Sequence, residues 1–86
     1  MGQWKKLRER ILLGNSDANI DFEDLCHLLR RFGFSERISG GHHIFNRSGI
    51  EEIINIQPKG GMAKSYQVAQ IRAIILKYHL GDESDE

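Results

Sequence analysis

The stretch that decides the fold covers residues 34–57 and reads FSERISGGHHIFNRSGIEEIINIQ. It contains two turn signals, Ser39-Gly40-Gly41 and Arg47-Ser48-Gly49, between segments that alternate or carry β-branched residues. Pro58 ends the last segment as a strand because proline has no backbone N–H to donate. Since consecutive hairpins produce an antiparallel sheet, we predict three antiparallel strands, over residues 34–38, 42–47 and 50–57.

Two helices flank these predicted strands. The first begins at Asp21, a good N-cap residue, and ends at Gly33. The second covers residues 66–79, with Ser65 as its expected N-cap and Gly81 as its stop. Each carries an apolar stripe that needs a surface to cover. We therefore expect both helices on one face of the sheet, with the other face open to solvent or a ligand.

The remaining segments lie at the two ends of the chain. Apolar residues at helical spacing predict an extra short helix over residues 3–13, followed by a polar linker. The last five residues, 82–86, include four acidic ones and are expected to be disordered. The predicted organisation is an α+β fold with an N-terminal helix and linker (1–20), a main domain (21–81) and an acidic tail (82–86).

Charge is distributed unevenly along the chain. The 86 residues carry 12 Lys and Arg against 12 Asp and Glu, a formal net charge of zero. Without the tail, residues 1–81 hold 12 basic and 8 acidic groups, or +4. The domain is thus mildly basic, which suits a polyanionic partner better than the total charge suggests.

Several classes of protein are disfavoured by the sequence. The longest apolar run, residues 73–76, is four residues long and too short to span a bilayer. No cationic segment followed by an apolar block opens the chain, so we expect no secretory signal. A single cysteine, Cys26, cannot form an internal disulfide and fits a reducing compartment. We expect a cytoplasmic protein that does not bind membranes.

Standard catalytic motifs are missing, so the chemistry has to come from individual residues. His42 and His43 open the second predicted strand, and strand alternation points them to opposite faces. They are therefore poorly placed to share a metal, and we expect neither a metal site nor a cofactor. One exposed histidine can transfer a proton near neutral pH; the alternative is that both are ordinary strand residues. Cys26 is expected to be a buried thiol.

Basic residues surround the hairpin that contains the two histidines. If they gather on one rim, they can contact phosphates, which supply most of the affinity for RNA or DNA. The alternative is a solvated surface paired with nearby glutamates. The residues concerned are Arg37, Arg47, Lys59 and Lys64.

The residues from about 21 to 80 resemble the HicA-type toxins of HicAB toxin–antitoxin pairs. No single motif carries this resemblance, which covers about two thirds of the chain and follows the family's order. The matching segments are LCHLLRRFGF (25–34), GGHHIF (40–45), IINIQP (53–58), QV (67–68), QIR (70–72) and ILK (75–77).

The resemblance implies a dsRBD-like αβββα fold and an mRNA-cleaving ribonuclease that stops translation. The family's Gly-Ser/Thr-His motif places the catalytic histidine at His42, with Gly41 where the family usually has a hydroxyl residue. It also implies a HicB-like antitoxin that masks this histidine. We expect Gly41 and the four basic residues named above to contact the RNA.

Three functions follow as hypotheses from the sequence. The leading one is a metal-independent endoribonuclease in which His42 moves protons and basic side chains stabilise negative charge. The second is an RNA-binding module that does not cut RNA. The third is an interaction domain that uses its open sheet face to bind another protein.

Overall fold

The computed structural model describes residues 3–82 and contains the predicted antiparallel sheet in the order β1-β2-β3. The strand boundaries differ from the prediction by one residue at Phe34, Ser39 and Gln57. Phe34 precedes the first strand because its buried ring and its N–H, bonded to the carbonyl of Leu29, belong to the end of the preceding helix. The strands are β1 (Ser35–Ser39), β2 (His42–Arg47) and β3 (Ile50–Ile56).

The helices begin and end close to the predicted positions. The carboxylate of Asp21 accepts a hydrogen bond from the N–H of Asp24 at 3.0 Å, which confirms the predicted N-cap. Ser65 was wrong as an N-cap, because the helix already includes it and Lys64 occupies the cap. The helical elements are α1 (Gln3–Leu13), a 3-10 turn η1 (Asp17–Asn19), α2 (Phe22–Arg31) and α3 (Ser65–Tyr78).

The end of α3 is also earlier than predicted. His79 adopts a left-handed conformation with φ of 56°, and the N–H of Leu80 bonds back to the carbonyl of Ile75. A residue in this conformation ends a helix just as a C-terminal glycine does. Gly81 is therefore not the stop, although it also has positive φ.

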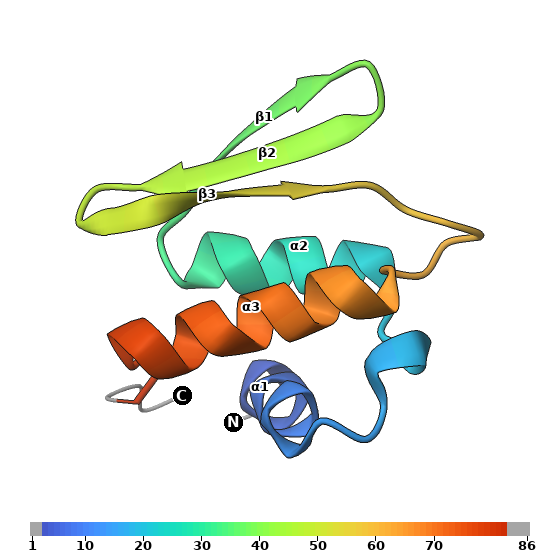
Figure 1. Ribbon diagram of the computed structural model, residues 1–86, viewed down its shortest axis with the longest axis vertical. Coiled ribbons are helices and arrows are strands. Elements are labelled where there is room, and N and C mark those ends of the chain that lie inside the picture. Colours follow the sequence, from blue (N-terminus) through green and yellow to red (C-terminus); the bar gives the residue numbers. More distant parts are fainter. Residues whose placement is uncertain (1–2, 83–86) are drawn as a thin grey trace.

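The molecule has three layers, with α2 and α3 on one face of the sheet and α1 beneath them (Figure 1). The other sheet face is open, as predicted. Phe45, Ile54 and Ile71 are fully buried between sheet and helices. Leu7 and Ile11 of α1 are buried in the same core, so the N-terminal helix is part of the folded unit. The fold class is α+β.

One ion pair fastens the segment between α1 and α2 to the rest of the fold. Arg72 of α3 donates to both carboxylate oxygens of Asp17, at 2.9 and 3.1 Å, and to the carbonyl of Ile11 at 3.1 Å. A bidentate guanidinium–carboxylate pair is among the stronger hydrogen-bonded contacts in proteins. The polar linker predicted from the sequence is thus held in place by α3.

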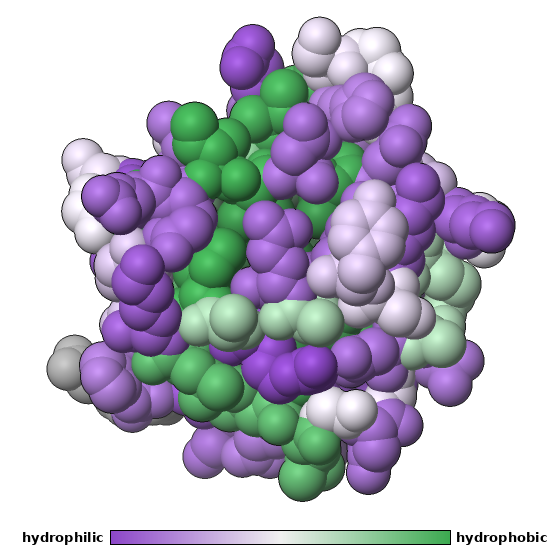
Figure 2. All heavy atoms as spheres, in the orientation of Figure 1, coloured by the Kyte–Doolittle hydropathy of each residue, from purple (hydrophilic) through white to green (hydrophobic). Residues whose placement is uncertain are grey.

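Hydrophobic side chains reach the surface at scattered places between hydrophilic ones (Figure 2). Among residues 3–82, no helix is both long and apolar enough to cross a membrane. The tail predicted to be disordered lies outside the described residues, apart from Asp82. The large apolar residues that are most exposed belong to several different elements: Leu13, Ile38, Ile53, Tyr66 and Leu76.

Candidate functional site

His42 is the first residue of β2, directly after the turn that joins β1 to β2. The turn residues Gly40 and Gly41 have φ of 56° and 90°, and Ser39 pairs with His42 across it. Two consecutive positive φ values match a type I′ hairpin turn, which favours glycine at both positions. The turn therefore fixes His42 at the end of the hairpin, where its side chain is exposed.

The imidazole of His42 has one hydrogen-bond partner on the neighbouring strand. Its Nδ1 lies 3.0 Å from Oδ1 of Asn55, a diagonal neighbour on β3. An amide oxygen only accepts hydrogen bonds, so the neutral imidazole donates from Nδ1 and keeps Nε2 as an acceptor. Asn55 thus sets both the tautomer and the orientation of the ring. Alternation along β3 puts Asn55 on the face opposite the buried Ile54 and Ile56, but the sequence did not indicate its contact with His42.

Arg37 lies on the same open face as His42. It sits opposite Ile44 in the β1–β2 register, while Ser39, two residues further along β1, sits opposite His42. Residues directly opposite one another in an antiparallel pair share a face, and diagonal neighbours are about 7–8 Å apart. The exposed guanidinium of Arg37 is therefore within reach of a group bound at His42.

Lys59 and Lys64 lie in the loop between β3 and α3, at the same end of the sheet as His42. His43 pairs with Ile56, so His42 lies beside the point where β3 ends and this loop begins. The amide of Gln67 in α3 is buried against the backbone N–H and carbonyl of Gln57, 3.3 Å from each, which anchors the start of the loop. The two lysines help to line an open groove with Gln57, Pro58, Gly60 and Tyr66.

Arg47 does not join this group. It ends β2, five residues beyond His42, which corresponds to roughly 17 Å along an extended strand. The β2–β3 register shifts between Phe45 and Arg47, and the Arg47 guanidinium donates to the carbonyl of Phe32 at 2.8 Å. The sequence grouped Arg47 with the hairpin, but the structure places it on the helical side of the sheet.

Gly41 was expected to contact the substrate, and the structure shows what its conformation requires. A Cβ on Gly41 would meet no atom within 4 Å, so space does not exclude a side chain. The φ of 90° does disfavour one, because side chains rarely adopt this region. Glycine at position 41, where the HicA-type toxins that the sequence resembles usually have Ser or Thr, thus suits the conformation of this hairpin.

His43 faces the helices, as strand alternation predicted. Its Nδ1 lies 2.7 Å from Oε2 of Glu36, and its ring packs edge-on against Phe22 with ring centroids 4.9 Å apart. Arg30 donates to the other oxygen of the same carboxylate at 2.8 Å. Burial opposes ionisation of Glu36, but the hydrogen bonds from His43 and Arg30 outweigh it and lower its pKa below the ordinary value. His43 is part of a structural network.

One group of side chains in the described part of the chain has the composition of a metal site. Donor atoms of Cys26, Glu36 and His43 lie within 4.8 Å of one another. Burial raises the pKa of the Cys26 thiol to about 12, and Glu36 is already bonded to His43 and Arg30. A metal would have to displace the thiol proton and the Arg30 contact. The sequence missed this group because its members come from three different elements.

Comparisons of the chain with protein-family models, with curated proteins and with solved structures give no match. We therefore infer the function from the geometry of the open sheet face and from the resemblance described above.

Proposed function

We propose that this chain is a metal-independent endoribonuclease that cleaves mRNA in the cytoplasm, with His42 as its catalytic residue. In this proposal it is the toxin of a toxin–antitoxin pair, with a dsRBD-like arrangement of its αβββα core. The observation that carries the proposal is the exposed His42 on an open sheet face, with its Nδ1 held by Asn55.

The chemistry needs little beyond a positioned proton carrier. The RNA 2′-hydroxyl attacks the adjacent phosphorus, its proton moves to a base, and the 5′-oxygen leaves with a proton. The acceptor Nε2 of neutral His42 suits the first proton transfer, and the protonated ring suits the second. The products are a 2′,3′-cyclic phosphate on one fragment and a 5′-hydroxyl on the other.

Basic side chains near His42 supply the charge stabilisation. Arg37 lies on the same face, and Lys59 and Lys64 lie along the loop at the same end of the sheet. Positive groups close to the phosphorane lower the energy of the transition state, which is often the largest contribution to catalysis. Together they make a path for an RNA backbone that passes over His42.

The nature of the cleaved bond gives the first test. Purified protein in EDTA should cut a single-stranded RNA and leave 2′,3′-cyclic phosphate ends, while the same RNA with 2′-O-methyl groups throughout should stay intact. Cutting of the methylated RNA, or of the matching DNA, would contradict the mechanism. Salt-sensitive binding with intact RNA after long incubation would instead support a binding module without catalysis.

The same open face offers a surface for the proposed HicB-like antitoxin. Ile53, 60% exposed, lies on this face two residues before Asn55. An inhibitor that covers His42 would also bury Ile53, so Ile53→Glu should weaken capture of the proposed antitoxin. Leu76→Glu, a change at an exposed apolar residue of α3, is the matched control. Equal capture of both variants would place the interface elsewhere.

A further inference from the structure

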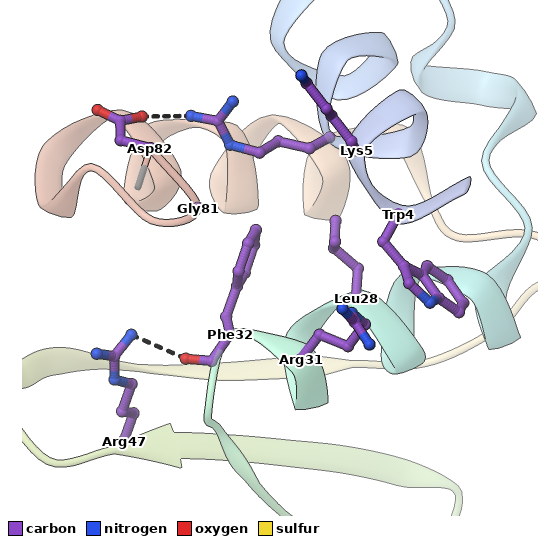
Figure 3. Close-up of a pocket in the computed structure, with 9 residues that line it drawn as sticks. Trp4, Lys5, Leu28, Arg31, Phe32, Arg47, Gly81 and Asp82 are labelled. Atoms are coloured by element: carbon purple, nitrogen blue, oxygen red, sulfur yellow. Dashed lines mark hydrogen bonds and ion pairs between the residues drawn. The ribbon is translucent and has the colours of Figure 1, made fainter. Parts of the chain in front are cut away.

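A second basic surface lies on the helical side of the molecule. It is a cavity of about 300 Å³ where α1, the end of α2, the end of β2 and the segment after α3 meet (Figure 3). Its lining residues are Trp4, Lys5, Arg8, Leu28, Arg31, Phe32, Arg47, Gly81 and Asp82.

The charges of this cavity favour an anion. Among residues 3–82, the lining includes four cationic side chains and a single acidic one, Asp82, which is paired with Arg8. Arg8 also donates to the carbonyl of Leu80 at 2.8 Å, as Arg47 does to that of Phe32. Backbone contacts thus hold two guanidinium groups in place, and each guanidinium has five N–H donors in a fixed plane. Such groups are well suited to phosphate.

The cavity also has an aromatic wall. Trp4 stacks on His27 with ring centroids 5.6 Å apart and 17° between the ring planes, which fixes the indole. The ring of Phe32 extends toward Gly81 (Figure 3). A Cβ on Gly81 would lie 3.0 Å from that ring and 2.8 Å from Nε of Arg8, so the close approach of this backbone requires glycine.

We propose that this cavity binds one nucleotide unit, with the base against Trp4 and Phe32 and the phosphate against Lys5, Arg31 and Arg47. Planar bases stack on aromatic side chains, while phosphates pair with arginine and lysine. The volume is at the lower end of the range for small-ligand pockets, which suits a single nucleotide. A free nucleotide and the phosphorylated end of an RNA strand present the same chemistry. The proposal does not depend on catalysis at His42.

Trp4 is the sole tryptophan of the chain, so its fluorescence reports on this cavity directly. The titration uses adenosine 5′-monophosphate, with adenosine and inorganic phosphate as partial ligands. We expect a saturable change with the monophosphate and at least about tenfold weaker binding of each part. The NMR resonance of the Trp4 indole N–H should shift as the monophosphate is added, and its titration should give the same dissociation constant.

Two lining residues provide the variants. Lys5→Ala and Arg31→Ala should each weaken binding about threefold to tenfold, while Lys6→Ala, an exposed residue of α1 outside the cavity, should leave it unchanged. Arg47 is not used here, because its guanidinium also donates to the carbonyl of Phe32, another residue of the same cavity. Circular dichroism and thermal unfolding check that each variant remains folded.

A pair of RNA hexamers, one with a 5′-phosphate and one with a 5′-hydroxyl, separates the two sources of the ligand. They are added to the His42→Ala protein, so that cleavage plays no part. Tighter binding of the phosphorylated hexamer than of the monophosphate would assign the site to strand ends; comparable or weaker binding would assign it to free nucleotides. The proposal is overturned if neither ligand gives a saturable change, if adenosine binds equally well, or if Lys5→Ala and Arg31→Ala both bind like wild type.

Discussion

The two ends of β2 differ although they belong to one strand of six residues. At the first residue, His42 is exposed on the open sheet face and held by Asn55. At the last residue, Arg47 is turned toward the helices and held by the carbonyl of Phe32. One end presents an exposed imidazole on the open sheet face, and the other presents a positive charge in the cavity that Trp4 and Phe32 line.

The two ends of β2 show that basic residues close in sequence can lie on different surfaces. Arg37 and Arg47 lie ten residues apart on paired strands, yet one faces outward beside His42 and the other lines a cavity under the sheet. Side-chain alternation and the register shift before Arg47 separate them. The two surfaces that we propose for phosphate chemistry are therefore separate, and variants can test each without the other.

The largest effect is expected in cells that lack the antitoxin. Expression of the wild-type chain should arrest growth, and His42→Ala should abolish the arrest because a catalytic proton carrier contributes about 10²–10⁴-fold in rate. Arg47→Ala, at the other end of the strand, should still arrest growth. If His42→Ala arrests growth at the same protein level as wild type, then the His42 end of β2 is no more important for growth arrest than the Arg47 end.

The two adjacent histidines should differ in their effect on stability. His43→Ala removes the contact with Glu36 and the edge-on packing on Phe22, so we expect a loss of roughly 1–3 kcal/mol in the free energy of unfolding. His42→Ala, on the exposed face, should change it by less than about 0.5 kcal/mol. Urea unfolding of both variants measures this; equal losses would mean that the faces are not distinct.

A smaller effect on the proposed catalysis is expected from the Asn55 contact. Asn55→Ala should lower the cleavage rate roughly tenfold, since the imidazole loses the partner that fixes its tautomer and orientation. Asn46, another exposed asparagine on the open face but near the Arg47 end of β2, gives the control variant Asn46→Ala. A pH–rate profile shows whether the tautomer is involved, and an unchanged rate and profile in Asn55→Ala would exclude this role.

The smallest effect concerns acid stability near the Arg47 end of the sheet. Hydrogen bonds from Lys77 and Tyr78 lower the pKa of Glu52 to about 2. A carboxyl whose pKa falls on folding stabilises the fold above its ordinary value of 4.5, and this stabilisation is lost as the pH falls toward 2. Glu52→Gln should lower Tm by roughly 1–4 °C at pH 7, with the difference vanishing toward pH 2.

The neighbouring carboxylate Glu51 is exposed and provides the control, Glu51→Gln. It should leave the acid dependence of Tm close to that of wild type. If Glu52→Gln and the wild type lose stability in parallel over the whole range, the contacts with Lys77 and Tyr78 do not matter for folding.

Much of the fold was predictable because local signals agreed with one another. Turn glycines at 40–41 and 49 marked the hairpins, Asp21 marked the start of α2, and alternation placed His42 and His43 on opposite faces. The errors at the two ends of α3, at Lys64 and His79, fall where a residue type that is uncommon at helix caps takes the cap position. The residue that ends a helix is set by tertiary contacts and not only by the intrinsic cap preference of each residue type.

The site was less predictable because its contacts cross between elements. The bond from His42 to Asn55 depends on the register of β2 against β3, and the bond from Arg47 to the carbonyl of Phe32 depends on how the end of α2 packs against the sheet. The cluster of Cys26, Glu36 and His43 and the cavity around Trp4 both require knowledge of how helices pack on the sheet and on each other. Spacing along the chain contains none of this information.

The central claim, that His42 on the open face cleaves RNA, is tested most directly by one rate measurement. Purified wild type, His42→Ala and Arg47→Ala proteins are incubated in EDTA with the same end-labelled RNA, each with a folded circular dichroism spectrum. We predict that His42→Ala cleaves the RNA at least about 100-fold more slowly than wild type, while the cleavage rate of Arg47→Ala stays within about threefold of wild type. Cleavage by His42→Ala at the wild-type rate would contradict it.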